Sequence, residues 1–259
     1  MSRFLNKVAI VTGSSNGIGQ ATAVLLAAEG ASVTIHGRSL DGLNATEKLI
    51  QDKEISSDRI LSIQGEIENE RTVEDLVKKT FEKFGKIDVL INSAGLGGKP
   101  GMDRNSMEAY EYIHEINVKS ILKLNNFVEP YLEKTKGNIV NVSSIAGILP
   151  RPATLPYGMS KASLDHYMRS MTHELAKKGI RINNVNSFAY KKPYFSSRLD
   201  RNKFPSATRN LRKRPGIFPP RLFQGDSSCT SWKSGRDRQS DRVPRKRRRV
   251  LRDWSGLGG

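Results

Sequence analysis

Short apolar runs alternate with longer amphipathic stretches as far as about residue 193. The apolar runs have the length of β-strands, and the amphipathic stretches repeat apolar residues at helical spacing. This alternation predicts an α/β fold, a Rossmann-like doubly wound parallel sheet in a single domain. We expect strands at residues 7–12, 31–36, 60–64, 87–91, 137–142 and 180–186. We expect helices at 20–29, 69–84 and 107–132, and a last helix that begins just before residue 157 and continues through 162–178.

The pattern stops after about residue 197, where Arg, Ser, Pro and Lys dominate. Such a composition cannot bury a core. Residues 1–189 contain 23 Lys and Arg against 21 Asp and Glu, whereas residues 190–259 contain 20 against 5. The net charge of +17 therefore belongs mainly to the tail. We expect a domain at residues 1–193 and an aberrant basic tail, irregular or disordered, at 194–259.

The location of the protein follows from what the sequence lacks. No apolar run approaches the ~18 residues of a membrane span, and the N-terminus runs into the first strand without a signal-peptide pattern. Cys229 is the single cysteine and cannot form an internal disulfide. These features predict a cytoplasmic protein in a reducing compartment, without a membrane partner.

A glycine-rich turn joins the first strand to the first helix. Glycines at such a turn let the backbone approach a pyrophosphate, whose charge then lies at the helix N-terminus. The next strand completes a βαβ unit of about thirty residues, which is the context that a dinucleotide site requires. The candidate contacts in this turn are Gly13, Ser15, Asn16, Gly17, Ile18 and Gly19.

Tyr157 and Lys161 are four residues apart, so on a helix they share one face. A free phenol titrates near pH ~10, and a neighbouring ammonium favours its ionised form. Pro150, Pro152 and Pro156 favour a rigid loop and a helix entry just before the tyrosine. Tyr157 is therefore a candidate general acid and base.

With these motifs, about residues 5–193 resemble the short-chain dehydrogenase/reductase family. The glycine turn has the spacing T-G-x-x-x-G-x-G, and residues 92–95 read N-S-A-G where the family has N-N-A-G. Thirteen positions separate Ser144 from Tyr157, as in the family. The resemblance implies a catalytic tetrad of Asn117, Ser144, Tyr157 and Lys161, with no metal.

The resemblance also implies a role for each member of the tetrad. Ser144 would hydrogen-bond the substrate carbonyl, and Tyr157 would give it a proton while a hydride arrives from the nicotinamide. Lys161 would bond the nicotinamide ribose and favour ionisation of Tyr157. Asn117 would hold a water that links Lys161 to solvent; without the resemblance it is a polar residue that bends a helix.

The end of the second strand bears on the choice of dinucleotide. NAD sites usually have Asp or Glu there, but this chain has Arg38 and no acid. An arginine can bind the 2′-phosphate of NADP with two hydrogen bonds. We therefore expect NADP(H), with NAD(H) still possible: Arg38 could merely begin a solvated loop, and Asn16 stands where NADP-preferring relatives often carry a second basic residue.

Two further turns carry contacts that the resemblance implies. Glu66 stands where the family usually has an Asp that contacts the adenine ring, and Ile67 can lend its backbone amide. Small residues in the segment 92–95 would let the cofactor ribose pack against the backbone. The candidate contacts there are Asn92, Ala94 and Gly95. A plain strand-ending turn needs the same residues.

The predicted function is an NAD(P)(H)-dependent oxidoreductase that interconverts a carbonyl and an alcohol. Its partner is a small-molecule carbonyl or alcohol, and a ketone, an aldehyde, a steroid or a sugar are all open. The family's usual homo-oligomer is doubtful with this tail. An alternative is an inactive relative that binds the cofactor without turnover.

The tail departs from the family, which follows the sixth strand with a substrate loop, a helix and a last strand. We hypothesise that the tail is read out of frame. Plausible codons for 231–245 and 249–259, shifted by one nucleotide, spell PGRVGETAKAIVFLA and VFYVTGVDWVV, which resemble the family's C-terminal region. Alternatively the tail is genuine, and the basic run 244–250 binds nucleic acid or directs nuclear import.

Overall fold

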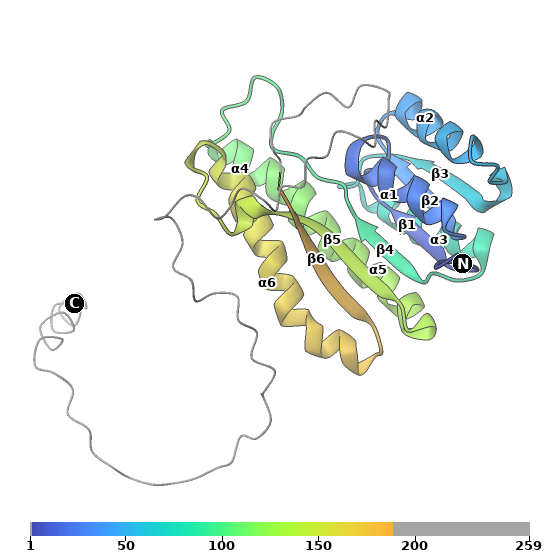
Figure 1. Cartoon of the computed structure of the whole chain (residues 1–259). Coiled ribbons are helices and arrows are strands. Elements are labelled where there is room, and N and C mark those ends of the chain that lie inside the picture. Colours follow the sequence, from blue (N-terminus) through green and yellow to red (C-terminus); the bar gives the residue numbers. More distant parts are fainter. Residues whose placement is uncertain (1, 189–259) are drawn as a thin grey trace, which may run out of the picture. The chain divides into compact units, whose positions relative to one another are not determined.

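The computed structural model describes residues 2–188. Six parallel strands form one sheet in the order β3-β2-β1-β4-β5-β6 (Figure 1). This order confirms the doubly wound parallel sheet, because the chain moves outward from β1 in one direction and then outward from β4 in the other. The strands are β1 (Val8–Val11), β2 (Ser32–Gly37), β3 (Ile60–Gln64), β4 (Val89–Asn92), β5 (Asn138–Ser144) and β6 (Arg181–Ser187).

Helices pack against both faces of the sheet (Figure 1). On one face, α1 (Gly17–Ala28) and α2 (Leu40–Gln51) cover β1 to β3; on the other lie α3 (Glu70–Phe84), α5 (Ser120–Thr135) and α6 (Leu155–Lys177). Each face has its own core of buried aliphatic side chains. All four residues of β1 are buried, as expected for a central parallel strand covered on both sides.

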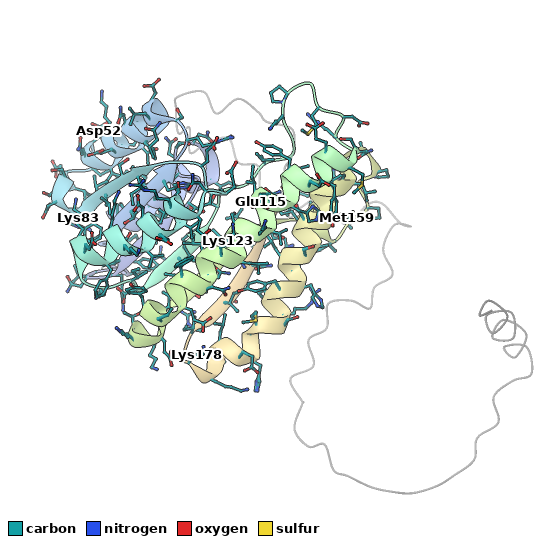
Figure 2. The ribbon with its side chains drawn as sticks, turned by 180° about the vertical axis from the view of Figure 1, so that it is seen from behind. Asp52, Lys83, Glu115, Lys123, Met159 and Lys178 are labelled. Atoms are coloured by element: carbon teal, nitrogen blue, oxygen red, sulfur yellow. The ribbon has the colours of Figure 1, made fainter. Side chains whose placement is uncertain are left out.

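The stretch predicted as one helix at 107–132 is interrupted in the structure. It consists of α4 (Met107–His114), a π-helical segment at Glu115–Lys119, and α5. A π-helical turn inserts an extra residue into the helix and is frequently found at functional sites. Figure 2 shows Glu115 and Lys123 on the helix that these three consecutive segments form, beside α6. Asn117 lies in the π-helical segment, the irregular part of that helix.

Side-chain caps fix the starts of three helices. Ser39 caps α2 by accepting from the Gly42 amide, Asn69 caps α3, and Ser106 caps α4. The helix α2 is not among the predicted helices. The segment before α6 contains short 3₁₀ turns at Ile145–Gly147 and Pro152–Thr154, which agrees with the proline-rich entry predicted there.

Several predictions concern residues that the structure does not describe. The boundary at 193, the tail at 194–259, Cys229 and the basic run 244–250 all lie outside residues 2–188. Within residues 2–188 the sheet ends at β6. In the same residues, no helix is both long and apolar enough to span a membrane.

Candidate functional site

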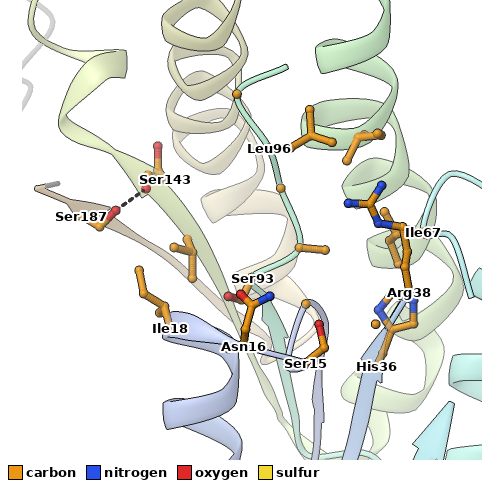
Figure 3. A pocket seen from close by; sticks show the side chains of 18 of the residues that line it. Ser15, Asn16, Ile18, His36, Arg38, Ile67, Ser93, Leu96, Ser143 and Ser187 are labelled. Atoms are coloured by element: carbon orange, nitrogen blue, oxygen red, sulfur yellow. Dashed lines mark hydrogen bonds between the residues drawn. The ribbon is translucent and has the colours of Figure 1, made fainter. Parts of the chain in front are cut away.

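A cavity of about 430 Å³ opens at the carboxyl ends of the central strands, where the strand order reverses between β1 and β4. Open α/β sheets bind ligands at this position. Figure 3 shows the two ends of the cavity: His36 in β2 and Arg38 just after it lie on one side, while Ser143 and Ser187 belong to β5 and β6 on the other. The described lining residues are Gly13, Ser15, Asn16, Ile18, Gly19, His36, Gly37, Arg38, Ile67, Glu68, Ser93, Ala94, Gly95, Leu96, Gly97, Ile116, Val142, Ser143, Tyr157, Lys161 and Ser187.

The glycine turn forms the floor in the middle of the cavity. Gly13 has φ +65, and a Cβ on it would lie 2.7 Å from the Ala94 backbone. A Cβ on Gly19 would clash with the Gly13 carbonyl. The turn can therefore fold this tightly only with glycine at both positions.

The turn delivers the N-terminus of α1 to the cavity. Asn16 is the N-cap residue, but its side chain makes no capping hydrogen bond. The first backbone amides of α1 therefore have no side-chain oxygen that accepts a hydrogen bond from them, unlike those of α2, α3 and α4. Amides in this state, together with the positive end of a twelve-residue helix, suit an anionic group such as a pyrophosphate.

The β2 end of the cavity carries one cation and one buried imidazole. The Arg38 side chain is exposed, and its backbone carbonyl accepts a hydrogen bond from Gln64 at 3.0 Å. His36 is 2% exposed, and neither ring nitrogen has a hydrogen-bond partner. Burial lowers the pKa of His36 to about 4, with the Gly65 backbone acting in the opposite direction. The ring is therefore neutral at pH 7.

The opposite end holds Tyr157 and Lys161, both on α6. Tyr157 is half-buried, and the Lys161 ammonium lies 5.7 Å from the centre of its ring. Lys161 is 4% exposed and donates a hydrogen bond to the Val142 carbonyl at 2.8 Å. Burial lowers the pKa of Lys161 to about 8, and the charge of Asp165 works against that fall.

Asn117 lies behind the cavity and holds the loop after β4. Its side-chain amide donates to the Leu96 carbonyl at 2.8 Å, and its carbonyl accepts from the Leu96 amide at 2.9 Å. It also donates to the Ser160 hydroxyl at 3.1 Å. A Cβ placed on Gly95 would lie 3.2 Å from the Asn117 oxygen and 3.5 Å from the Lys161 ammonium, so these groups converge at Gly95.

The two serines that end β5 have different surroundings. Ser144 accepts a hydrogen bond from the Ala146 amide at 3.2 Å and makes a long one, 3.4 Å, to the Ser187 carbonyl. Ser143 lines the cavity, and its hydroxyl donates to the Lys161 carbonyl at 3.3 Å. The weak bond to Ser187 leaves the Ser144 hydroxyl able to turn toward another acceptor.

A chain of amide side chains crosses the sheet beneath the site. Asn92 donates to Asn125 and Asn141, both at 2.9 Å, and Asn141 donates to Asn184 at 2.9 Å. Asn184 in turn donates to the carboxylate of Asp165 at 2.7 Å. This network ties β4, β5 and β6 to α6. Because Asp165 is one turn beyond Lys161, the network ends next to the buried ammonium.

Most of the predicted site residues gather on the cavity wall. The structure places eleven of them among the described lining residues: Gly13, Ser15, Asn16, Ile18, Gly19, Arg38, Ile67, Ala94, Gly95, Tyr157 and Lys161. Five others are not among these lining residues: Gly17 in the turn, exposed Glu66, Asn92 in the amide network, Asn117 behind Leu96, and Ser144 at the end of β5.

Several lining residues were not predicted from the sequence. They include His36, Glu68, Ser93, Leu96 and Ser143. All of them lie within a few residues of the carboxyl end of β2, β3, β4 or β5. The position of the predicted strand ends was therefore a signal that could have found them.

These residues fit a bound dinucleotide. The glycine turn has no room for a Cβ at Gly13 or Gly19, the start of α1 has no side-chain cap, and the exposed Arg38 side chain can hold a phosphate. A metal is not suggested in the described part of the chain, since no three His, Cys, Asp or Glu residues there are grouped to hold one.

The comparisons with known proteins agree with this geometry. Residues 7–200 match the family model described as short chain dehydrogenase. An uncharacterised oxidoreductase of Staphylococcus saprophyticus is 36% identical over 186 residues, 71% of this chain and 79% of that protein. The 3-oxoacyl-[acyl-carrier-protein] reductase FabG of Thermotoga maritima is 33% identical over 184 residues, 71% and 74% of the two chains.

Solved structures give the same result. The apo-form of a glucose dehydrogenase of Caenorhabditis elegans is 40% identical with a TM-score of 0.67, over 71% of this chain and 74% of that one. A 7α-hydroxysteroid dehydrogenase, complexed with NADH and 7-oxo glycochenodeoxycholic acid, is 31% identical with a TM-score of 0.65, over 71% of each chain. Fold, site and relatives all lead to one conclusion: this chain belongs to the short-chain dehydrogenase family of oxidoreductases.

Proposed function

We propose that this protein interconverts a small-molecule carbonyl and the corresponding alcohol, with Tyr157 as the acid and base and NADP(H) as the preferred cofactor. One observation carries the proposal. A single cavity is lined by Arg38 at one end, by the glycine turn in the middle and by Tyr157 and Lys161 at the other end. The cytoplasmic location and the homo-oligomer stay predictions from the sequence.

Different parts of the cavity would bind different groups of the cofactor. The amides at the start of α1 would bind the pyrophosphate, and Arg38 would bind the 2′-phosphate. Ala94 and Gly95 would leave room for the ribose near Lys161. When bound, the nicotinamide supplies or accepts the hydride.

Tyr157 would donate a proton to the carbonyl oxygen during reduction and accept it back during oxidation. The Lys161 ammonium, 5.7 Å from the centre of the Tyr157 ring, would interact favourably with the negative charge left on the oxygen. Ser144 would turn its hydroxyl from the Ser187 carbonyl to the substrate oxygen. Asn117 would act indirectly, because it fixes the Leu96 loop that closes this end of the cavity.

The proposed activity is tested by adding NADPH or NADH and a panel of carbonyls to the full chain. The panel contains a ketosteroid, an aldose, a 3-oxoacyl thioester and a simple aldehyde, and the measurement is the loss of reduced-nicotinamide absorbance. Turnover of any of them supports the function. If NADPH fluorescence reports binding but none of a broad range of carbonyls or alcohols reacts, the chain is a cofactor-binding protein without this activity.

Arg38→Ala tests the preference for NADP(H). We expect the Kd for NADPH to rise by roughly 10- to 100-fold, because the charge-assisted bonds to the 2′-phosphate are lost, while the Kd for NADH changes little. Fluorescence titration measures both constants. Arg71→Ala, on exposed α3 and outside the cavity lining, is the matched control. Equal loss for NADPH and NADH would contradict the assignment of Arg38 to the 2′-phosphate.

Asp165→Asn tests the electrostatic support of Lys161. Asp165 raises the pKa of Lys161, so its neutralisation lowers that pKa and the ammonium is lost at lower pH. We expect the alkaline limb of the kcat/KM profile to move to lower pH. The variant also loses a carboxylate that accepts from Asn184 and Asn186, which should lower the free energy of unfolding by about 1–3 kcal/mol.

The control for this variant is Asp75→Asn, on the exposed face of α3. Its profile should match that of the unmodified protein. An unchanged alkaline limb in Asp165→Asn, together with the expected loss of stability, would leave Asp165 a structural residue only.

A further inference from the structure

Asn186 joins the end of strand β5 to helix α6. It lies in β6, and its side-chain amide donates to the Asp165 carboxylate at 2.8 Å and to the Ser144 carbonyl at 3.2 Å. A longer contact, of 3.5 Å, reaches the Ser143 hydroxyl. Asn186 is not among the described residues that line the cavity. It can therefore influence the chemistry only through the residues that it contacts.

The Asp165 carboxylate determines which way the Asn186 amide faces. A carboxylate only accepts hydrogen bonds, so the NH₂ group of the amide, and not its carbonyl, faces Asp165. This group carries two hydrogens, and the nearer of its other two acceptors is the Ser144 carbonyl. Asn184 donates to the second oxygen of the same buried carboxylate at 2.7 Å. The carboxylate is thus held from two sides, and it directs the Asn186 donor toward Ser144.

Ser144 stands at the point where the chain leaves the sheet. It is the last residue of β5, and its backbone is extended, with φ −153 and ψ 151. A 3₁₀ turn, Ile145–Gly147, begins at the next residue. The hydrogen bond from Asn186 to the Ser144 carbonyl restrains the backbone at this junction. Because the backbone sets the direction of the Cα–Cβ bond, it also determines where the Ser144 hydroxyl lies.

The segments on either side of Ser144 are held as well. A Cβ on Gly147 would lie 2.8 Å from the backbone of α6 and 3.1 Å from an Asp165 oxygen, so the 3₁₀ turn packs closely on the helix. On the other side, the Ser187 hydroxyl donates to the Ser143 carbonyl at 3.2 Å (Figure 3). The backbone around Ser144 is therefore fixed between α6 and β6.

The hydroxyl of Ser144 is held less firmly than its backbone. It accepts from the Ala146 amide at 3.2 Å and makes a long bond, 3.4 Å, to the Ser187 carbonyl. A fixed backbone with a hydroxyl that can turn suits a group that has to meet a substrate oxygen. Donors that are already in place when charge develops on such an oxygen lower the barrier of the reaction.

We propose that Asn186 is a positioning residue, which holds the Ser144 backbone so that the serine hydroxyl can donate to the substrate carbonyl. This inference rests on the proposed function, since Ser144 meets a substrate oxygen only in that mechanism. Loss of the Asn186 amide should misplace the serine without changing the glycine turn or Arg38. Its effect should therefore fall on turnover and not on binding of the dinucleotide.

The test is a double-mutant cycle in the full chain, with NADPH and the carbonyl that reacts fastest. We expect Asn186→Ala to lower kcat/KM by about 10- to 100-fold while the Kd for NADPH stays within about twofold. Ser144→Ala should lower kcat/KM at least as much. In the double variant, the Asn186 substitution should cost less than about threefold, because the hydroxyl that it positions is absent. A merely structural role predicts the same loss in both backgrounds.

Asn184→Ala is the matched control, because Asn184 donates to the same carboxylate and has no hydrogen bond to Ser144. Both variants should lower the Tm by roughly 2–8 °C, but Asn184→Ala should keep kcat/KM within about threefold. Asn186→Ser, a smaller polar side chain, serves as the second variant if Asn186→Ala does not fold. Equal losses of kcat/KM in the Asn184 and Asn186 variants overturn the proposal, and so does full additivity in the double variant.

The proposed function fails differently. If the unmodified chain binds NADPH but turns over neither carbonyls nor alcohols, both proposals fall. If it turns them over and Ser144→Ala leaves kcat/KM unchanged, the oxidoreductase activity stands and the roles of Ser144 and Asn186 are lost. If Ser144→Ala is impaired and Asn186→Ala is not, only the role of Asn186 is lost.

Discussion

Tyr157→Phe is expected to lower kcat for carbonyl reduction by about 10²- to 10⁴-fold while leaving the Kd for NADPH within about twofold. The phenol supplies the proton that the carbonyl oxygen needs, and phenylalanine keeps the ring but lacks that proton. The half-buried ring still fills the cavity wall, so cofactor binding has no reason to change. Stopped-flow or steady-state loss of NADPH absorbance measures kcat, and fluorescence titration measures Kd.

Tyr167→Phe is the matched control, on the same helix. Burial raises the pKa of Tyr167, which accepts a hydrogen bond from Asn125 at 3.3 Å and does not line the cavity. It therefore lies outside the reach of a substrate in the cavity, and we expect its loss to leave kcat nearly unchanged. If Tyr157→Phe retained full turnover, another group would have to donate the proton, and the proposed mechanism would be wrong.

The sheet could be predicted well because its strands are short and apolar. The predicted strand at 60–64 agrees with β3 at both ends, and the other strands differ by one or two residues at their ends. The glycine turn has a similarly local cause. Gly13 has φ +65, and a Cβ on Gly19 would meet the Gly13 carbonyl six residues before it, so the spacing of these two glycines is visible in the sequence, although Gly13 also lies against the Ala94 backbone from a distant segment.

Helix α2 was not predicted because its sequence favours a helix only weakly. Gly42 and Asn44 are poor helix formers near its start. A Cβ on Gly42 would lie 2.6 Å from the Ser15 carbonyl, so the close approach of α2 to the glycine turn requires glycine there. The sequence predicted only a bend at Asn117, where the structure has a π-helical segment. Asn117 makes two hydrogen bonds to Leu96, a distant residue, and the local sequence does not indicate such contacts.

The site divides in the same way. Tyr157 and Lys161 are four residues apart, so helical geometry alone brings them together. The sequence did not indicate the burial of His36, because the Gly65 backbone that faces it belongs to the segment after β3. The amide network from Asn92 to Asp165 joins three strands and a helix, and no local sequence pattern reports such contacts.

Lys161→Met is expected to lower kcat by about 10²- to 10³-fold and yet to stabilise the fold. The ammonium is 4% exposed, and its pKa falls from 10.5 to about 8, so folding at pH 7 disfavours the charged form. A difference of this size corresponds to about 3 kcal/mol. Methionine has a similar length and no charge, so most of that cost should disappear, less the lost hydrogen bond to Val142. Denaturant unfolding measures the gain.

The stability advantage of Lys161→Met should depend on pH in a definite direction. Below about pH 8 the lysine is charged in both folded and unfolded chains, and the burial cost is fully present. From pH 8 to 10.5 the folded protein has lost the proton that the unfolded chain still holds, so the unmodified protein gains stability and the advantage of Lys161→Met declines. Lys177→Met, at an exposed site, should show neither effect. An advantage that persisted unchanged above pH 10 would mean that packing, and not the buried charge, distinguishes the two proteins. With the expected decline, the lysine's charge costs stability in the folded protein and is retained for the chemistry at Tyr157.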